Sequence, residues 1–126
     1  MSFERILQSI VDECGGGFGI TLMGLDGIPI EQTVPAGGPR AEDPFEGDVT
    51  TAGIEFGRIL ADMNKASDTL GTGRVRETVI GLDRATLIVH GVEDDLMVVL
   101  AISPDGNLGK ARYLIRRNLN EIRAQL

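Results

Sequence analysis

Residues 18–32 read FGITLMGLDGIPIEQ, a stretch that predicts two strands joined by a tight turn. Ile20, Leu22 and Met23 place apolar side chains on both faces of the first strand, which indicates that both faces are at least partly buried. Asp26–Gly27 supplies the turn, because glycine accepts positive φ and aspartate tolerates it. Pro29 cannot donate a ladder hydrogen bond, so we expect the second strand to lie at an edge and the hairpin to be architectural.

Three segments around this hairpin have apolar residues at helical spacing. The first covers residues 2–14, with Ser2 as the expected N-cap and glycines 15–17 as the stop. The second covers residues 48–70, and either Asp48 or Thr50 is expected to cap it. The third covers residues 107–125, where the apolar positions keep a regular 3/4 spacing.

Three further strands are predicted at residues 74–80, 85–91 and 95–103. The connections between them are short, which favours an antiparallel meander, and the last strand is apolar on both faces, as a central strand is. We therefore expect an α+β sandwich in the order helix, two strands, helix, three strands, helix. A single domain over 1–126 would hold one five-stranded antiparallel sheet with helices on its faces, and a mobile Pro/Gly-rich loop at 33–47.

The formal net charge of −7 argues against nucleic acid or an anionic membrane as the main partner. Basic residues nevertheless concentrate in the predicted final helix, where they could meet an acidic partner or form a solvated face, and we favour the solvated face. The chain has one cysteine, no run long enough to span a membrane and a charged, amphipathic N-terminus. We expect a cytoplasmic protein without membrane insertion.

No motif in the sequence assembles a catalytic site. His90 is the only histidine, and a lone strand histidine is more often a packed residue than a general base. Glu93, Asp94 and Asp95 fit a solvated hairpin turn better than a cation site. The glycines at 15–19 and 71–73 lead into strands, whereas phosphate loops lead into helices. We therefore expect no enzyme, no cofactor and no metal.

Gly53, Gly57 and Ala61 recur every four residues in the predicted central helix. A glycine inside a helix costs about 1 kcal/mol relative to alanine, so this spacing suggests that something approaches the backbone closely. Two explanations remain open from the sequence: packing against the chain's own sheet, or packing against the same helix of a second copy.

In segment order, the chain resembles the Roadblock/dynein light-chain family. GITLMGLDGIPIEQ is similar to the family's first hairpin, and TTAGIEF is similar to the start of its central helix. DDLMVVLAIS and NLGKARYLIRRNLNEI resemble the last strand and helix, including the L-G-x-x-R pattern of Leu108, Gly109 and Arg112. Within the family the chain is most similar to bacterial Roadblock proteins of the gliding-motility polarity system, and closer to the MglC adaptor type than to the MglB type.

The resemblance implies a homodimer in which the central helix and the third strand pair with their symmetry mates. The interface residues expected from it are Ala52, Gly53, Phe56, Gly57, Leu60, Ala61, Asn64, Val75, Glu77 and Val79. It also implies a non-enzymatic adaptor that binds another Roadblock protein or a small Ras-like GTPase in cell polarity and motility.

Two alternatives to the adaptor stay open. One is direct GTPase activation by Arg40, Arg74 or Arg76, among which the sequence does not choose. The other is a small-ligand sensor with the loop 33–47 as a lid over an apolar pocket. The charges of Arg74 and Arg76 fit poorly with a paired interface strand.

Overall fold

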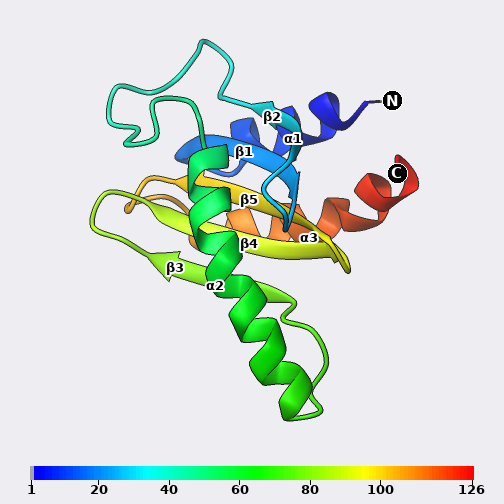
Figure 1. Cartoon of the computed structure of the whole chain (residues 1–126). Coiled ribbons are helices and arrows are strands. Elements are labelled where there is room, and N and C mark those ends of the chain that lie inside the picture. The colour runs from blue at the N-terminus through cyan, green and yellow to red at the C-terminus, as the bar shows by residue number, and fades with distance from the viewer. Residues whose placement is uncertain (1) are drawn as a thin grey trace.

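The computed structural model describes residues 2–126 and has the expected order of elements (Figure 1). The N-terminal part holds α1 (Phe3–Glu13), β1 (Gly17–Gly24) and β2 (Pro29–Thr33). The long helix α2 (Thr50–Thr69) follows, and then come β3 (Glu77–Gly81), β4 (Thr86–Glu93), β5 (Leu96–Ile102) and α3 (Leu108–Ala124). None of the helices among residues 2–126 is both long enough and apolar enough to cross a bilayer.

The five strands form one antiparallel sheet in the order β2–β1–β5–β4–β3. β5 lies in the middle and is buried along nearly its whole length, which confirms the prediction of a central strand. β2 lies at one edge and begins at Pro29, as the missing N–H of proline required. β3 forms the other edge, so the predicted meander of β3, β4 and β5 is also confirmed.

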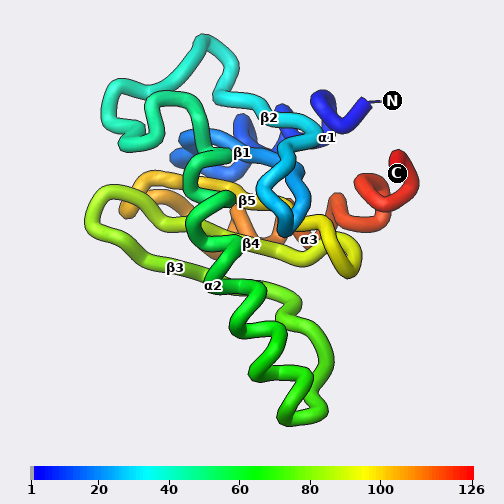
Figure 2. Tube along the Cα trace, viewed as in Figure 1, coloured from blue at the N-terminus to red at the C-terminus, as the bar shows by residue number. Residues whose placement is uncertain are grey.

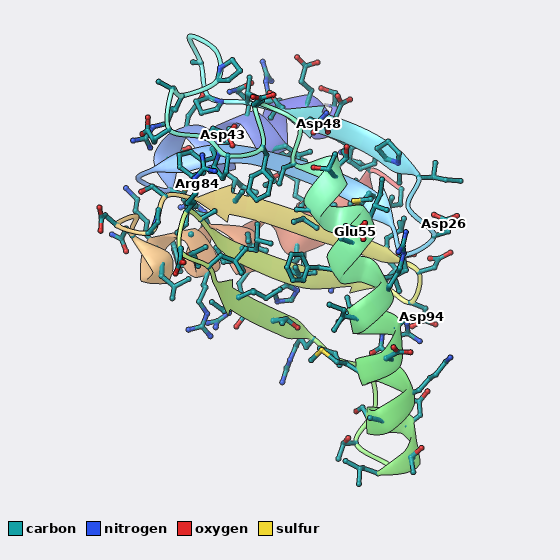
Figure 3. The ribbon with its side chains drawn as sticks, turned by 60° about the vertical axis from the view of Figure 1, so that its left-hand side comes forward. Asp26, Asp43, Asp48, Glu55, Arg84 and Asp94 are labelled. Atoms are coloured by element: carbon teal, nitrogen blue, oxygen red, sulfur yellow. The ribbon has the colours of Figure 1, made fainter. Side chains whose placement is uncertain are left out.

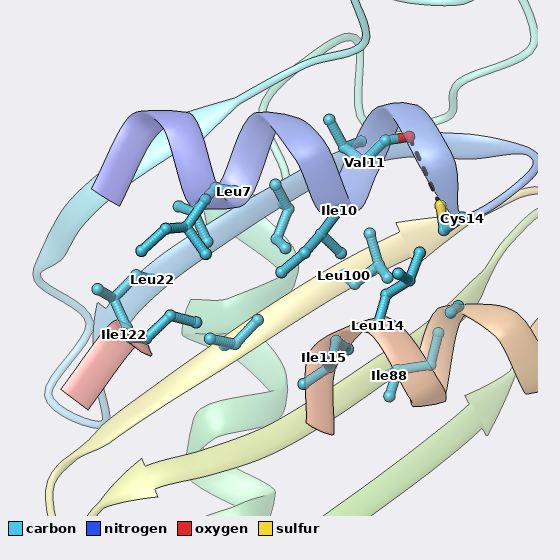
Figure 4. Close-up of a cluster of buried hydrophobic side chains, with 14 of the residues drawn as sticks. Leu7, Ile10, Val11, Cys14, Leu22, Ile88, Leu100, Leu114, Ile115 and Ile122 are labelled. Atoms are coloured by element: carbon cyan, nitrogen blue, oxygen red, sulfur yellow. Dashed lines mark hydrogen bonds between the residues drawn. The ribbon is translucent and has the colours of Figure 1, made fainter. Parts of the chain in front are cut away.

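The helices cover the two faces of the sheet unequally (Figure 1). α1 and α3 lie together on one face, where Leu7, Ile10 and Ile115 pack with Leu22 and Leu100 of the sheet (Figure 4). α2 lies alone on the opposite face, over a second cluster that includes Met23, Met97 and Val99. With strands buried from both sides, the core is aliphatic and needs no disulfide.

Several boundaries differ from the sequence predictions, each for a local reason. β3 begins at Glu77 rather than at residue 74, because the N–H of Val75 donates to Oδ1 of Asn64 in α2 (2.8 Å) instead of entering the ladder. Val49 is the N-cap of α2, although Asp48 Oδ1 still accepts the Thr50 N–H (3.2 Å). Ser2 occupies the N-cap position of α1 without a side-chain capping bond.

The surroundings of the two glycines in α2 explain why small residues recur on this helix. A Cβ at Gly53 would lie 2.1 Å from Sδ of Met23, and a Cβ at Gly57 would lie 3.4 Å from Cε of Met97. Both glycines therefore face the chain's own sheet, so close approach to a second copy is not the reason for them. Ala61 is exposed and does not share this face.

The loop at 33–47 arches over the end of the sheet near α1 and β1 (Figure 2). Its path is held by Asp43, which is 5% exposed and accepts the N–H groups of Phe45 (2.8 Å) and Gly47 (2.9 Å). Two side chains of α1 also hold it, because Gln8 donates to the Val34 carbonyl and Asp12 accepts the Ala36 N–H. Mobility of this loop stays a prediction, and it would have to break these bonds.

Candidate functional site

The outer face of α2 carries an apolar stripe that is largely exposed among residues 2–126, although Phe56 at its N-terminal end packs against the chain's own core. Its members are spaced alternately by three and four residues: Phe56, Ile59, Met63, Ala66 and Leu70. Ile59 is 53% exposed and Leu70 is 76% exposed, whereas Phe56 is half-buried. This spacing is the seam pattern of two packed helices. We call these five residues the α2 stripe.

The C-terminal half of α2 extends beyond the β3 edge of the sheet (Figures 1 and 3). The connection at 70–76 that returns to β3 runs beside it there and is tied to it by the bond from the Val75 N–H to Asn64. A helix end that projects from its own core has one face free for another protein.

The residues expected at the interface divide into three groups by burial. Buried in the chain's own core are Ala52, Gly53, Gly57, Leu60 and Asn64. Half-buried are Phe56, Val75 and Glu77, and exposed are Ala61 and Val79. Most of the α2 residues expected at the interface thus lie on its inward face, and the interface itself stays a prediction. The outward residues Ile59, Met63 and Leu70 were identifiable by their 3/4 spacing, but spacing alone does not say which face looks outward.

β3 adds a free strand edge next to the α2 stripe. Among residues 2–126 it pairs with β4 alone, and Val79 on it is 40% exposed.

Glu77 at the start of β3 forms ion pairs with α3, to Nη2 of Arg112 (2.7 Å) and Nε of Arg116 (3.5 Å). The hydrogen bond from Arg112 holds the pKa of Glu77 below its ordinary value of 4.5, despite partial burial, and the same contact raises the pKa of Arg112.

A basic hollow of about 1030 Å³ opens between β3 and α3, on the face of the sheet opposite α2. Five arginines line it together with Glu77: Arg74, Arg76, Arg112, Arg116 and Arg123. We expected the arginines of α3 to form a solvated face. Arg116 and Arg123 are indeed exposed, but the structure also brings them and Arg112 together with two arginines that precede β3, a convergence between distant segments that the sequence does not reveal.

The residues tested for chemistry do not form a reactive group. His90 is buried on β4, and its Nδ1 lies 2.9 Å from the Gly91 carbonyl. The Cys14 thiol contacts the Val11 carbonyl (Figure 4), and burial raises its pKa to about 11, so it is protonated at neutral pH. Asp94 lies at the same end of the sheet as Asp26 (Figure 3) and forms an ion pair with Arg74. No group of three or more metal-ligating side chains gathers within residues 2–126.

The hollow beside the loop 33–47 has a volume of about 810 Å³. Its lining mixes the charged residues Arg40, Glu42, Arg84 and Asp105 with apolar surface that includes Phe18, so it is not the wholly apolar pocket that a sensor lid was expected to cover. Arg84 lies at the opposite end of the sheet from Asp94 (Figure 3). Arg40 is engaged within the chain, since it pairs with Glu42 (2.5 Å) and lies over Phe18 (5.5 Å).

Among the three arginines considered for GTPase activation, Arg40 and Arg74 have acidic partners within the chain. Arg76 forms no ion pair with any residue in the range 2–126. The geometry of the described residues therefore does not choose an activating arginine among the three.

Comparison with known proteins gives one clear relationship. No family model matches the sequence, and no curated protein matches it. Among solved structures, MglC from Myxococcus xanthus is 31% identical, with both chains covered completely and a TM-score of 0.69. The gliding protein MglB from Thermus thermophilus is 18% identical, with 97% of this chain and 86% of that chain covered and a TM-score of 0.79.

A Roadblock/LC7 domain from Streptomyces avermitilis is 14% identical, with 98% of this chain and 97% of that chain covered, and its TM-score is 0.79. The last two likenesses show the fold alone. The identity to MglC extends over the whole length of both chains, and it shows the family. The chain belongs to the Roadblock family, and the likeness that places it there is to MglC.

Proposed function

We propose that this chain is a homodimeric, non-enzymatic adaptor that binds a partner Roadblock protein or a small Ras-like GTPase in a cell polarity and gliding-motility pathway. The observation that carries the proposal is the α2 stripe, an apolar helix face that projects from the sheet and whose members Ile59, Met63 and Leu70 are exposed. The similar structures support the pathway, since two are named as MglC and as a gliding protein, and another MglB is described as tetrameric.

The α2 stripe suits association because burial of apolar surface contributes about 25 cal/mol for each Å² removed from water. Two copies of α2 packed along the stripe would cover Ile59, Met63 and Leu70 together. The β3 edge lies next to the stripe, and joining two such edges would satisfy backbone groups that otherwise invite uncontrolled pairing. Both features therefore favour a paired state of the chain.

The test uses size-exclusion chromatography with light scattering on the chain alone, with a Roadblock partner and with a Ras-like GTPase loaded with GTP. The wild type should elute as a dimer and form a larger complex with one of the two partners. Ile59→Glu places a charge in the α2 stripe and should give a folded monomer that loses the complex.

Ile54→Glu is the matched control, because Ile54 is also exposed on α2 but lies away from the stripe. It should keep both the dimer and the complex. A folded wild-type monomer at all concentrations, or a complex unaffected by Ile59→Glu, would refute the proposal. Single-turnover GTP hydrolysis should not accelerate on addition of the chain, and acceleration would assign the activating role instead.

A further inference from the structure

The basic hollow concentrates positive charge in a chain that is acidic as a whole. Five arginines line it against the single carboxylate of Glu77, whereas the complete chain has a formal net charge of −7. Like charges repel one another, so such a concentration is unfavourable in the free protein. A concave site lined by one sign of charge raises the local concentration of ligands of the opposite sign.

Three of the arginines are held in place by the fold. Arg123 donates from Nε to the Val92 carbonyl (2.8 Å), Arg112 bonds to Glu77, and Arg74 bonds to the carbonyl of Asp94. Fixed guanidinium groups lose less conformational freedom when a ligand binds. Arg76, in contrast, has no ion-pair partner within residues 2–126 and remains available to an incoming anion.

The hollow already holds one carboxylate, that of Glu77. Arg112 donates to Oε1 of Glu77 from both Nε (3.0 Å) and Nη2 (2.7 Å), and Arg116 approaches Oε2 at 3.5 Å. Oε2 is buried and has no hydrogen-bond donor within the described chain. The arginines therefore have a geometry suited to carboxylates, and one internal carboxylate leaves most of their charge uncompensated.

We propose that the basic hollow binds an acidic segment of a partner protein, with Asp or Glu side chains of that segment contacting Arg76, Arg116 and Arg123. This inference names the partner chemistry of the proposed adaptor and rests on that function. The volume of about 1030 Å³ exceeds what a single phosphate needs and accommodates several side chains of a peptide. A flat membrane does not fit a recessed site on a chain of net negative charge.

The hollow and the α2 stripe lie on opposite faces of the sheet, so both can be occupied at once. An acidic segment in the hollow would leave the stripe free for a second copy of the chain. The adaptor would then join two kinds of contact: an apolar one through α2 and an electrostatic one through α3.

The test measures fluorescence anisotropy of a labelled peptide of alternating Glu and Gly, with a Gln–Gly peptide of equal length for comparison. The full chain should bind the Glu peptide, and the Gln peptide should bind about tenfold more weakly or worse, as expected for loss of charge-assisted hydrogen bonds. Arg76→Gln combined with Arg123→Gln should weaken Glu-peptide binding by about tenfold or more. Glu77→Gln should strengthen it, because Arg112 and Arg116 lose their internal carboxylate.

Arg117→Gln is the matched control, because Arg117 is adjacent to Arg116 on α3 but lies over Tyr113 outside the hollow. It should leave peptide binding unchanged. Equal weakening by Arg117→Gln, equal binding of the two peptides, or competition by inorganic phosphate at constant ionic strength would overturn the proposal. Binding of anionic phosphatidylserine vesicles that the Arg76/Arg123 variant abolishes, without peptide binding, would assign the hollow to membranes and overturn it as well.

Light scattering and circular dichroism on each variant separate this inference from the adaptor proposal. The hollow variants should remain folded dimers, since none of them alters the α2 stripe and the joining of β3 edges uses backbone groups that these substitutions keep. If the chain is a dimer that does not bind the Glu peptide, only the proposal for the basic hollow is refuted. If it is a monomer that binds the Glu peptide, only the dimeric adaptor is refuted.

Discussion

At position 53, α2 comes so close to the sheet that no side chain fits without movement of Met23. Gly53→Ala should therefore destabilise the fold, because overpacking of a filled core costs about 1–3 kcal/mol and outweighs the gain in helix propensity. The added methyl of Gly57→Ala lies 3.4 Å from the terminal Cε of Met97 and 3.7 Å from the Leu25 carbonyl oxygen, so it meets no severe clash. It should be neutral or stabilising by up to about 1 kcal/mol. Urea unfolding of the two variants measures the contrast.

The pair serves as its own control, since both glycines lie inside the same helix and receive the same methyl group. Equal stability of the two variants would show that Met23 can move aside and that Gly53 is not a packing requirement. The sequence revealed that these glycines needed an explanation. It could not identify Met23 as the neighbour, because that contact joins residues thirty positions apart.

At the level of elements, the tie between β3 and α3 depends on pH. Glu77 has a folded-state pKa below its ordinary value of 4.5, chiefly through the hydrogen bond from Arg112. The folded state thus binds fewer protons than the unfolded state in the acid range, so the contribution is present above about pH 4.5 and is lost as pH falls through the lowered pKa. Glu77→Gln should lower stability at neutral pH, and the difference from wild type should shrink toward zero in acid.

Thermal unfolding of both proteins across the acid range measures this difference. Glu121→Gln removes a carboxylate of α3 that makes no ion pair within residues 2–126, and it should leave stability at neutral pH unchanged. A gap between wild type and Glu77→Gln that stays constant with pH would contradict the ion-pair explanation.

The elements themselves were largely predictable from the sequence. The apolar pattern of residues 18–32 and the Asp26–Gly27 turn predicted the β1–β2 hairpin. The apolar residues on both faces of β5 predicted that this strand lies in the middle of the sheet. Contacts between distant segments were not predictable in the same way. The buried Asp43 reads as one charge among several in a loop, and its role as an acceptor for Phe45 and Gly47 appears only once the loop has folded. Local patterns thus predicted the strands, while the structure of the long loop depends on contacts with α1 and β1.

For the molecule as a whole, most of the α2 residues that the sequence analysis placed at an interface are buried in the chain's own core, and the interface itself stays a prediction. Gly57 was expected at the seam between copies, yet it faces Met97 of the chain's own sheet. A substitution such as Gly57→Arg would therefore disturb the core and say little about association. Both faces of α2 carry apolar residues, so periodicity alone does not distinguish the covered face from the exposed one. The basic hollow was not predicted from the sequence, because its arginines come from two distant segments that only the fold brings together.

Association through the α2 stripe should make the stability of the chain depend on its concentration. A dimer that dissociates on unfolding is stabilised by mass action. Its thermal midpoint should therefore rise by roughly a few degrees for each tenfold increase in protein concentration. Differential scanning calorimetry of wild type, Ile59→Glu and Ile54→Glu measures this. The concentration dependence should vanish in Ile59→Glu and persist in Ile54→Glu, because only Ile59 lies on the stripe. A wild-type midpoint that is independent of concentration would mean that the exposed face of α2 does not hold two copies together.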